Sequence, residues 1–145
     1  MSRSAEIVVE VPADTAYLAA IRQVTRSFAR SAGFSERVAD EIQLAVDEVC
    51  AAASERSPAP GRRLRVEFGR DSRKVWLEVT DEGNEWPLVF ASDVGVSSLE
   101  SESDPMGYVI VSAYMDEVDF QQTDEGSLVR LVRSLPGTSG RVRRV

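Results

Sequence analysis

The sequence contains no histidine and a single cysteine, and each of these scarcities excludes particular catalytic sites, metal sites or cross-links. Without histidine there is no Ser-His-Asp triad and no histidine-ligated zinc site. Cys50 cannot form a disulfide within the chain, and it falls on the apolar side of a helical pattern. We therefore expect Cys50 to pack in a core rather than to act as a reactive thiol.

Long hydrophobic runs are missing as well. No stretch reaches the roughly 18 consecutive apolar residues of a membrane span, and residues 1–6 lack the apolar centre of a signal peptide. Acidic residues (24) outnumber basic residues (17), which gives a formal net charge of -7. This charge disfavours a general nucleic-acid surface and favours a basic partner. We expect a cytoplasmic protein with no membrane segment and no direct contact to nucleic acid.

What the sequence does contain suits one domain, because 145 residues with 43% hydrophobic residues can build a single core. We assign residues 1–136 to that domain and residues 137–145 to a flexible basic tail. Alternating apolar residues predict strands, and three- and four-residue apolar spacing predicts helices. The predicted strands are 5–11, 64–68, 75–79, 116–120 and 127–132, and the predicted helices are 18–32, 35–54 and 107–115.

This element order predicts an α+β fold, a two-layer sandwich with helices packed on one face of a mixed, mostly antiparallel sheet. Residues 84–104 show little periodicity and many Ser, Glu and Asp residues. A loop of about twenty residues is unusual in a compact domain, so we expect a lid or a disordered segment there. Trp76 falls on the opposite side of its strand from Val75 and Leu77, and we expect it to be packed rather than to stack on a ligand.

The helix over residues 40–53 is the centre of the pattern. Its apolar positions recur at three- and four-residue steps, while Glu48 and Ala52 fall off that stripe, one turn apart. Taken alone, the acidic side indicates only a solvated helix face. Two later stretches, residues 81–87 and 105–118, change this interpretation, because all three stretches together match the order and spacing of one family.

The three stretches resemble the anti-sigma serine kinases of bacteria, also called switch-protein kinases, within the wider Bergerat-fold, histidine-kinase-like ATPases. The first family motif reads Leu-Ala-Val-x-Glu-Ala-x-x-Asn-Ala, and it is matched at Leu44, Ala45, Val46, Glu48 and Ala53. The second reads Asp-x-Gly-x-Gly-Phe-Asp-Pro, and it is matched at Asp81 and Gly83, with Trp86 as the aromatic. The third ends in Met-Asp-Glu-Val, and it is matched at Gly107, Ile110, Val111 and residues 115–118.

The resemblance covers residues 7 to about 133 and implies a nucleotide site for ATP or ADP with Mg²⁺. Asp81 would accept the adenine amino group, and Ser127 would help to hold the base. Gly83 and Gly107 would let the backbone approach the nucleotide and its phosphates. Glu48 matches the carboxylate that positions and deprotonates the attacking hydroxyl in phosphoryl transfer.

Three positions depart from the family pattern, and all three fall in that site. Ala52 stands where the family has the Asn that donates an oxygen to Mg²⁺. Glu85 replaces a Gly and places negative charge where phosphates would lie. Pro105 replaces the first Gly of the third motif and removes an N–H from the phosphate loop. Together these departures predict a weakened or lost ATP site.

Two functions follow from the resemblance. The first is an anti-sigma factor that sequesters an RNA polymerase sigma subunit, with little or no catalysis, and is countered by a STAS-type antagonist. The second is an active Mg-ATP-dependent serine kinase that phosphorylates the antagonist. A histidine-kinase-like fragment is a weaker third interpretation, because no His-bearing dimerisation helix precedes the domain.

The family also implies a homodimer and a role in partner switching, as in stress responses. On the first helix, Arg22, Arg26 and Arg30 share one side. They predict either a solvated basic face or, following the family, part of a dimer or partner surface.

Overall fold

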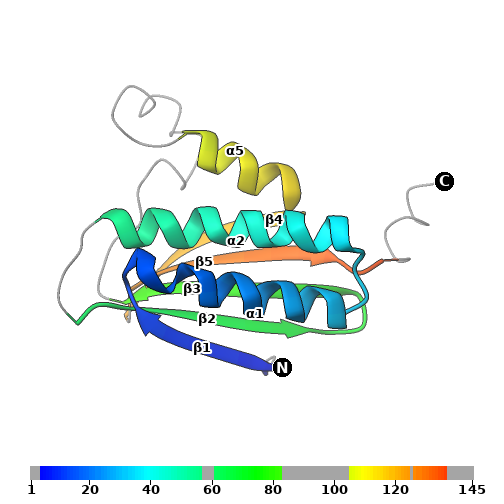
Figure 1. Ribbon diagram of the computed structural model, residues 1–145, viewed down its shortest axis with the longest axis horizontal. Coiled ribbons are helices and arrows are strands. Elements are labelled where there is room, and N and C mark those ends of the chain that lie inside the picture. Colours follow the sequence, from blue (N-terminus) through cyan, green and yellow to red (C-terminus); the bar gives the residue numbers. More distant parts are fainter. Residues whose placement is uncertain (1–3, 57–60, 83–104, 125, 137–145) are drawn as a thin grey trace.

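A computed structural model describes residues 4–56, 61–82, 105–124 and 126–136. The predicted lid at 84–104 and the predicted tail at 137–145 lie outside these ranges. Figure 1 shows the described elements in place. In chain order they are β1 (Ile7–Pro12), the short 3-10 helix η1 (Thr15–Tyr17), α1 (Leu18–Ser31), α2 (Glu36–Arg56), β2 (Arg63–Arg70), β3 (Lys74–Glu82), α5 (Pro105–Tyr114), β4 (Glu117–Thr123) and β5 (Gly126–Ser134).

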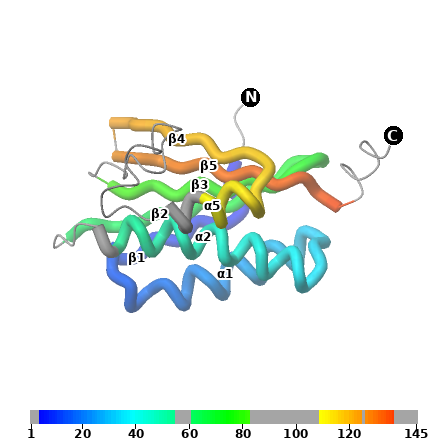
Figure 2. Tube along the Cα trace, turned by 90° about the horizontal axis from the view of Figure 1, so that it is seen from above, coloured from blue at the N-terminus to red at the C-terminus, as the bar shows by residue number. Residues whose placement is uncertain are grey.

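The five strands form one sheet in the order β1-β2-β3-β5-β4, and α1 and α2 cover one face of it (Figure 1). The second view shows α5 beside α2, on the side where β5 and β4 lie (Figure 2). The predicted two-layer α+β fold is confirmed. Every pairing among the described strands is antiparallel, so the sheet is more uniform than the mixed one we expected.

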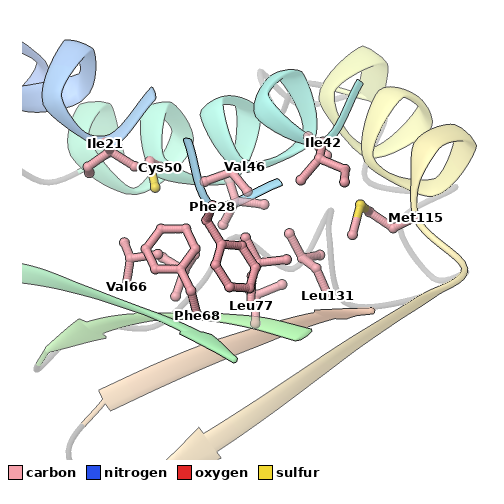
Figure 3. Close-up of a cluster of buried hydrophobic side chains, with 14 of the residues drawn as sticks. Ile21, Phe28, Ile42, Val46, Cys50, Val66, Phe68, Leu77, Met115 and Leu131 are labelled. Carbon is pink, nitrogen blue, oxygen red and sulfur yellow. The ribbon is translucent and has the colours of Figure 1, made fainter. Parts of the chain in front are cut away.

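The core lies between the helices and the covered face of the sheet. Figure 3 shows Phe28 of α1 and Val46 of α2 directed toward Phe68 and Leu77 of the sheet. The rings of Phe28 and Phe68 meet with centroids 5.4 Å apart in a tilted arrangement. Cys50 is fully buried in the same cluster, as its place on the apolar stripe predicted.

Capping residues set the ends of the first two helices where the sequence placed them. Gly33 follows α1 with a φ of 104°, a backbone conformation that glycine adopts without strain. The Ser35 hydroxyl accepts a hydrogen bond from the backbone N–H of Val38 at 3.2 Å and so caps α2. The third helix begins at Pro105, two residues earlier than expected, and proline suits the first position of a helix.

Trp76 lies on the uncovered face of the sheet, yet it is only 3% exposed. Its register partner on β2 is Gly69, and a Cβ atom at Gly69 would lie 2.3 Å from the indole ring. From β5, the Arg130 guanidinium lies 5.7 Å from the ring centroid. Trp76 is therefore packed by its neighbours within the sheet, which confirms the structural role that we expected.

The three arginines of α1 form ion pairs with α2. Arg22 contacts Asp47, and Arg30 contacts Glu36, at 3.0 and 2.9 Å. Between them, Arg26 contacts both Glu36 and Asp40. The arginine side of α1 is therefore a ladder of ion pairs between two helices, rather than the freely solvated face that the spacing allowed.

Candidate functional site

The candidate site lies where β3 ends and β5 begins. Asp81 is the register partner of Ser127, and both side chains are completely buried. Asp81 follows Leu77 and Val79 on the covered face of its strand, so the carboxylate lies beneath the helical layer. The structure thus brings together the two residues to which the resemblance gave the nucleotide base.

The carboxylate lies close to the C-terminal half of α2. Burial raises the pKa of the Cys50 thiol far above its usual range, and the negative charges of Asp47 and Asp81 raise it further. The thiol is therefore protonated at neutral pH and inert as a nucleophile.

Arg62 is the residue of this site that sequence reasoning missed. Its Nε and Nη2 donate hydrogen bonds to Oδ1 of Asp81 at 3.2 and 2.6 Å. The two side chains are 10% and 1% exposed, so this is a buried ion pair. Nη2 also donates to the carbonyl oxygen of Ala53 at 3.0 Å, one of the last four carbonyls of α2. One arginine therefore joins the end of α2 to the acidic residue of β3.

Ser127 takes part in a second polar contact at the same place. Its hydroxyl donates to Oε1 of Gln122, on the neighbouring strand β4, at 2.9 Å. Both Ser127 and Asp81 are thus already held by protein groups. A ligand that enters here has to exchange its own polar groups for these contacts.

Glu48 and Ala52 lie one turn apart on α2, and both are half-buried. With Glu41 they form a second stripe along α2, the stripe of Glu48, which is distinct from the apolar one. Glu41 contacts Arg133 of β5 at 3.2 Å. The stripe therefore faces the α5 and β5 side of the molecule. Phosphoryl transfer from ATP uses Mg²⁺, which takes near-octahedral oxygen ligands.

Ala52 does not fit the Mg²⁺ ligand that the resemblance implies at its position. The methyl group of Ala52 has no oxygen to offer. In the parts of the chain that the structure describes, no three His, Cys, Asp or Glu side chains gather as metal ligands. Ala52 thus has no oxygen to place one turn from Glu48, where the resemblance implies a ligand for Mg²⁺.

The other predicted site residues are placed only in part. Gly83 and Glu85 lie outside the described residues, so their predicted roles stay predictions. Pro105 and Gly107 lie in the first turn of α5, where only the backbone is described. Side-chain contacts are therefore described mainly at the end of the site formed by Asp81 and Ser127, which we call the base end.

A second polar cluster lies toward the N-terminal half of α2, beside a cavity of about 590 Å³. Here Nη1 of Arg133 donates to Glu41 at 3.2 Å and to the carbonyl oxygen of Tyr114, the last residue of α5, at 2.7 Å. Asp116 accepts a hydrogen bond from the backbone N–H of Ser134 at 2.7 Å. Asp116 belongs to the third motif, so at least part of that motif serves to fasten β4 to β5.

The comparisons identify the class of protein that this fold and site define. The profile of the histidine kinase-like ATPase domain matches residues 11–133, and the chain belongs to this family. Among the described residues, no helix combines the length and apolarity that a membrane crossing needs.

One similar solved structure is that of the RsbU and RsbW domains of Rv1364c from Mycobacterium tuberculosis. It matches with a TM-score of 0.59 and 16% sequence identity over 89% of this chain. The match spans 32% of that structure's chain, so this protein corresponds to about a third of it. The comparison with curated protein sequences gave no significant match.

Proposed function

We propose that this protein is an anti-sigma regulatory factor that binds an RNA polymerase sigma subunit, is released by a STAS-type antagonist, and makes little use of ATP. The observation that carries the proposal is the state of the nucleotide site on α2. Glu48 is present, but Ala52 one turn away offers no ligand for Mg²⁺. The binding scaffold is thus retained, while the group that phosphoryl transfer depends on is missing.

Further support comes from the family, the neighbour and the charge. The chain belongs to the histidine kinase-like ATPase family, and its fold is similar to a structure whose title names an RsbW domain. Its formal net charge of -7 suits a basic partner surface. Following the anti-sigma kinases that the sequence resembles, we propose that the protein is cytoplasmic and forms a homodimer. Sedimentation of the purified protein tests the dimer.

Transcription in vitro tests the anti-sigma activity. RNA polymerase core enzyme is reconstituted with each sigma factor of the source organism in turn, and transcript yield is measured with and without the protein. We expect the yield to fall for one alternative sigma factor and to recover when its STAS-type antagonist is added. Unchanged yield with every sigma factor would contradict the proposal.

The second candidate function, an active serine kinase, is favoured by the presence of Glu48. Titration calorimetry with ATP and ADP, with and without Mg²⁺, separates the two. We expect no tight Mg²⁺-dependent binding. Tight binding, together with phosphate transfer to the antagonist that Glu48→Gln abolishes, would make the kinase the primary function.

The missing magnesium ligand gives a gain-of-function prediction. Ala52→Asn supplies a side-chain oxygen one turn from Glu48, so Mg²⁺-dependent ADP affinity should rise by about tenfold, the effect of roughly 1.4 kcal/mol. Ala51→Asn is the matched control, because Ala51 is also half-buried but lies off the stripe of Glu48. If neither variant gains affinity, Ala52 is not the main obstacle, and Glu85 or Pro105 dominates instead.

A further inference from the structure

We propose that Arg62 is an internal occupant of the base-binding position, and that its guanidinium holds the oxygen of Asp81 that the amino group of adenine would otherwise engage. This inference rests on the proposed function, because it takes the buried end of β3 and β5 as the base end of the site. It adds a regulatory residue to that site. Before any nucleotide binds, the Asp81 oxygen that would accept the base already accepts hydrogen bonds from Arg62.

The geometry of the contact carries the first step. Both hydrogen bonds from Arg62 to Asp81, at 3.2 and 2.6 Å, end on the same oxygen, Oδ1. That oxygen is completely buried beneath α2, and Arg62 is nearly so. An incoming amino group that needs Oδ1 therefore competes with two existing donors in a space from which water is largely excluded.

Charge decides the competition. Arg62 is a cation, and hydrogen bonds from a charged donor to a carboxylate are roughly twice as strong as those between neutral groups. The amino group of adenine is neutral, so replacing Arg62 by adenine would remove a buried cation from beside the Asp81 carboxylate. A nucleoside alone should therefore displace Arg62 poorly.

The third contact of Arg62 explains how it is held in place. Nη2 also binds the carbonyl oxygen of Ala53 at 3.0 Å, near the C-terminus of α2, where the helix dipole favours positive charge. Displacing Arg62 thus also releases the end of α2. A purely structural explanation, in which Arg62 only caps the helix, is the alternative that the experiment has to separate.

Adenosine is the suitable probe, because it carries neither phosphates nor a need for Mg²⁺. Its binding reports on the base end alone, independently of Ala52, Glu85 and Pro105. Inosine is the matched control ligand, because a carbonyl oxygen replaces the amino group and cannot donate to Asp81. Binding is followed by titration in backbone amide NMR spectra, which detect affinities in the millimolar range and also show whether each variant is folded.

We expect Arg62→Ala to bind adenosine about tenfold or more tightly than the natural protein, with no comparable gain for inosine. Arg63→Ala is the control variant, since Arg63 is the next residue, is 43% exposed and lies near Glu10 of β1. It should bind adenosine as the natural protein does. A folded Arg62→Ala protein without the gain, or with an equal gain for inosine, would overturn the proposal and leave Arg62 as a helix cap.

If Arg62→Ala does not fold, a second variant keeps the test decisive. Arg62→Met combined with Asp81→Asn removes both charges together, so no unpaired charge is left buried. The Asn side-chain oxygen can still accept the adenine amino group. This double variant should also gain about tenfold in adenosine affinity, and a folded protein without that gain would overturn the proposal. Because no sigma factor takes part, failure here is distinguishable from failure of the transcription test.

Discussion

Two arginines bind α2 at opposite ends, and they differ mainly in burial. Arg133 contacts the carboxylate of Glu41 and the helix carbonyl oxygen of Tyr114. Arg62 likewise contacts the carboxylate of Asp81 and the helix carbonyl oxygen of Ala53. The side chains of the Arg133 pair are 22% and 21% exposed, against 10% and 1% for the Arg62 pair. The two clusters are about 18 Å apart along α2, at 1.5 Å per residue.

The comparison shows that similar contacts can serve different purposes. The Arg133 cluster joins α2, α5 and β5 beside an open cavity, where water still solvates the charges. The Arg62 cluster is sealed beneath α2, where an ion pair is costly unless it is complete. The buried ion pair lies at the end of β3, where the resemblance implies the nucleotide base, and this position agrees with the competition that we propose.

Breaking the buried pair should have the largest effect. Arg62→Ala removes the buried cation that pairs with Asp81, and we expect a loss of about 3–5 kcal/mol in the free energy of unfolding. Urea denaturation followed by circular dichroism measures this loss. Replacing both residues, with Arg62→Met and Asp81→Leu, should restore most of it, because no charge then remains buried. A loss from Arg62→Ala of less than about 1 kcal/mol would show that the pair is effectively solvated.

Breaking the partly exposed pair of Arg133 and Glu41 should lower the free energy of unfolding by less. Arg133→Ala removes two hydrogen bonds, one of which is the ion pair with Glu41, from a site that water can enter, and we expect a loss of about 1–2 kcal/mol in the free energy of unfolding. The same urea experiment applies. Raising the salt concentration from about 0.1 to 1 M, which shortens the Debye length from about 10 to 3 Å, should reduce this difference but not that of Arg62→Ala. Equal salt dependence in both variants would remove the distinction between the clusters.

The ladder between α1 and α2 gives the smallest expected effect and so sets the lower limit of the comparison. The side chains of Arg30 and Glu36 are 55% and 60% exposed. Arg30→Ala should therefore change the free energy of unfolding by less than about 0.5 kcal/mol. Thermal unfolding with Ser31→Ala as the neighbouring control measures the difference. A loss as large as that of Arg133→Ala would mean that the ladder acts as one cooperative network.

The elements that local patterns control could be predicted from the sequence. The predicted helices 18–32 and 35–54 break where Gly33 and the Ser35 cap separate α1 from α2, and alternation predicted the strands that the structure shows as β2 and β3. The meeting of Asp81 with Ser127 came from the family resemblance, since 46 positions separate them along the chain and nothing in their spacing implies a contact. The register of β3 against β5 is what places them together.

Arg62 could not be predicted, for a physical reason. It follows a stretch with two prolines and a glycine and precedes the alternation of β2, so no periodicity assigns its side chain to a face. Ala53 lies 9 positions away at a helix end, and Asp81 lies 19 positions away on a different strand. The ion pairs between α1 and α2 were predicted only in part. The spacing placed the arginines of α1 on one side, but their acidic partners on α2 were not recognised, namely Glu36, Asp40 and Asp47.

The register between β3 and β5 has a consequence for how such a protein can change over evolution. Glu82, at the end of β3, pairs with Gly126, at the start of β5, and the chain between them includes α5 and β4. The entropic cost of closing a loop between fixed ends grows only with the logarithm of its length, about 0.6 kcal/mol for each doubling. Length changes between Glu82 and Pro105, before α5 begins, therefore weigh little on the pairing of β3 with β5. Glu85 falls in this interval and Pro105 ends it, so the weakening of the ATP site that we propose requires no change in the sheet.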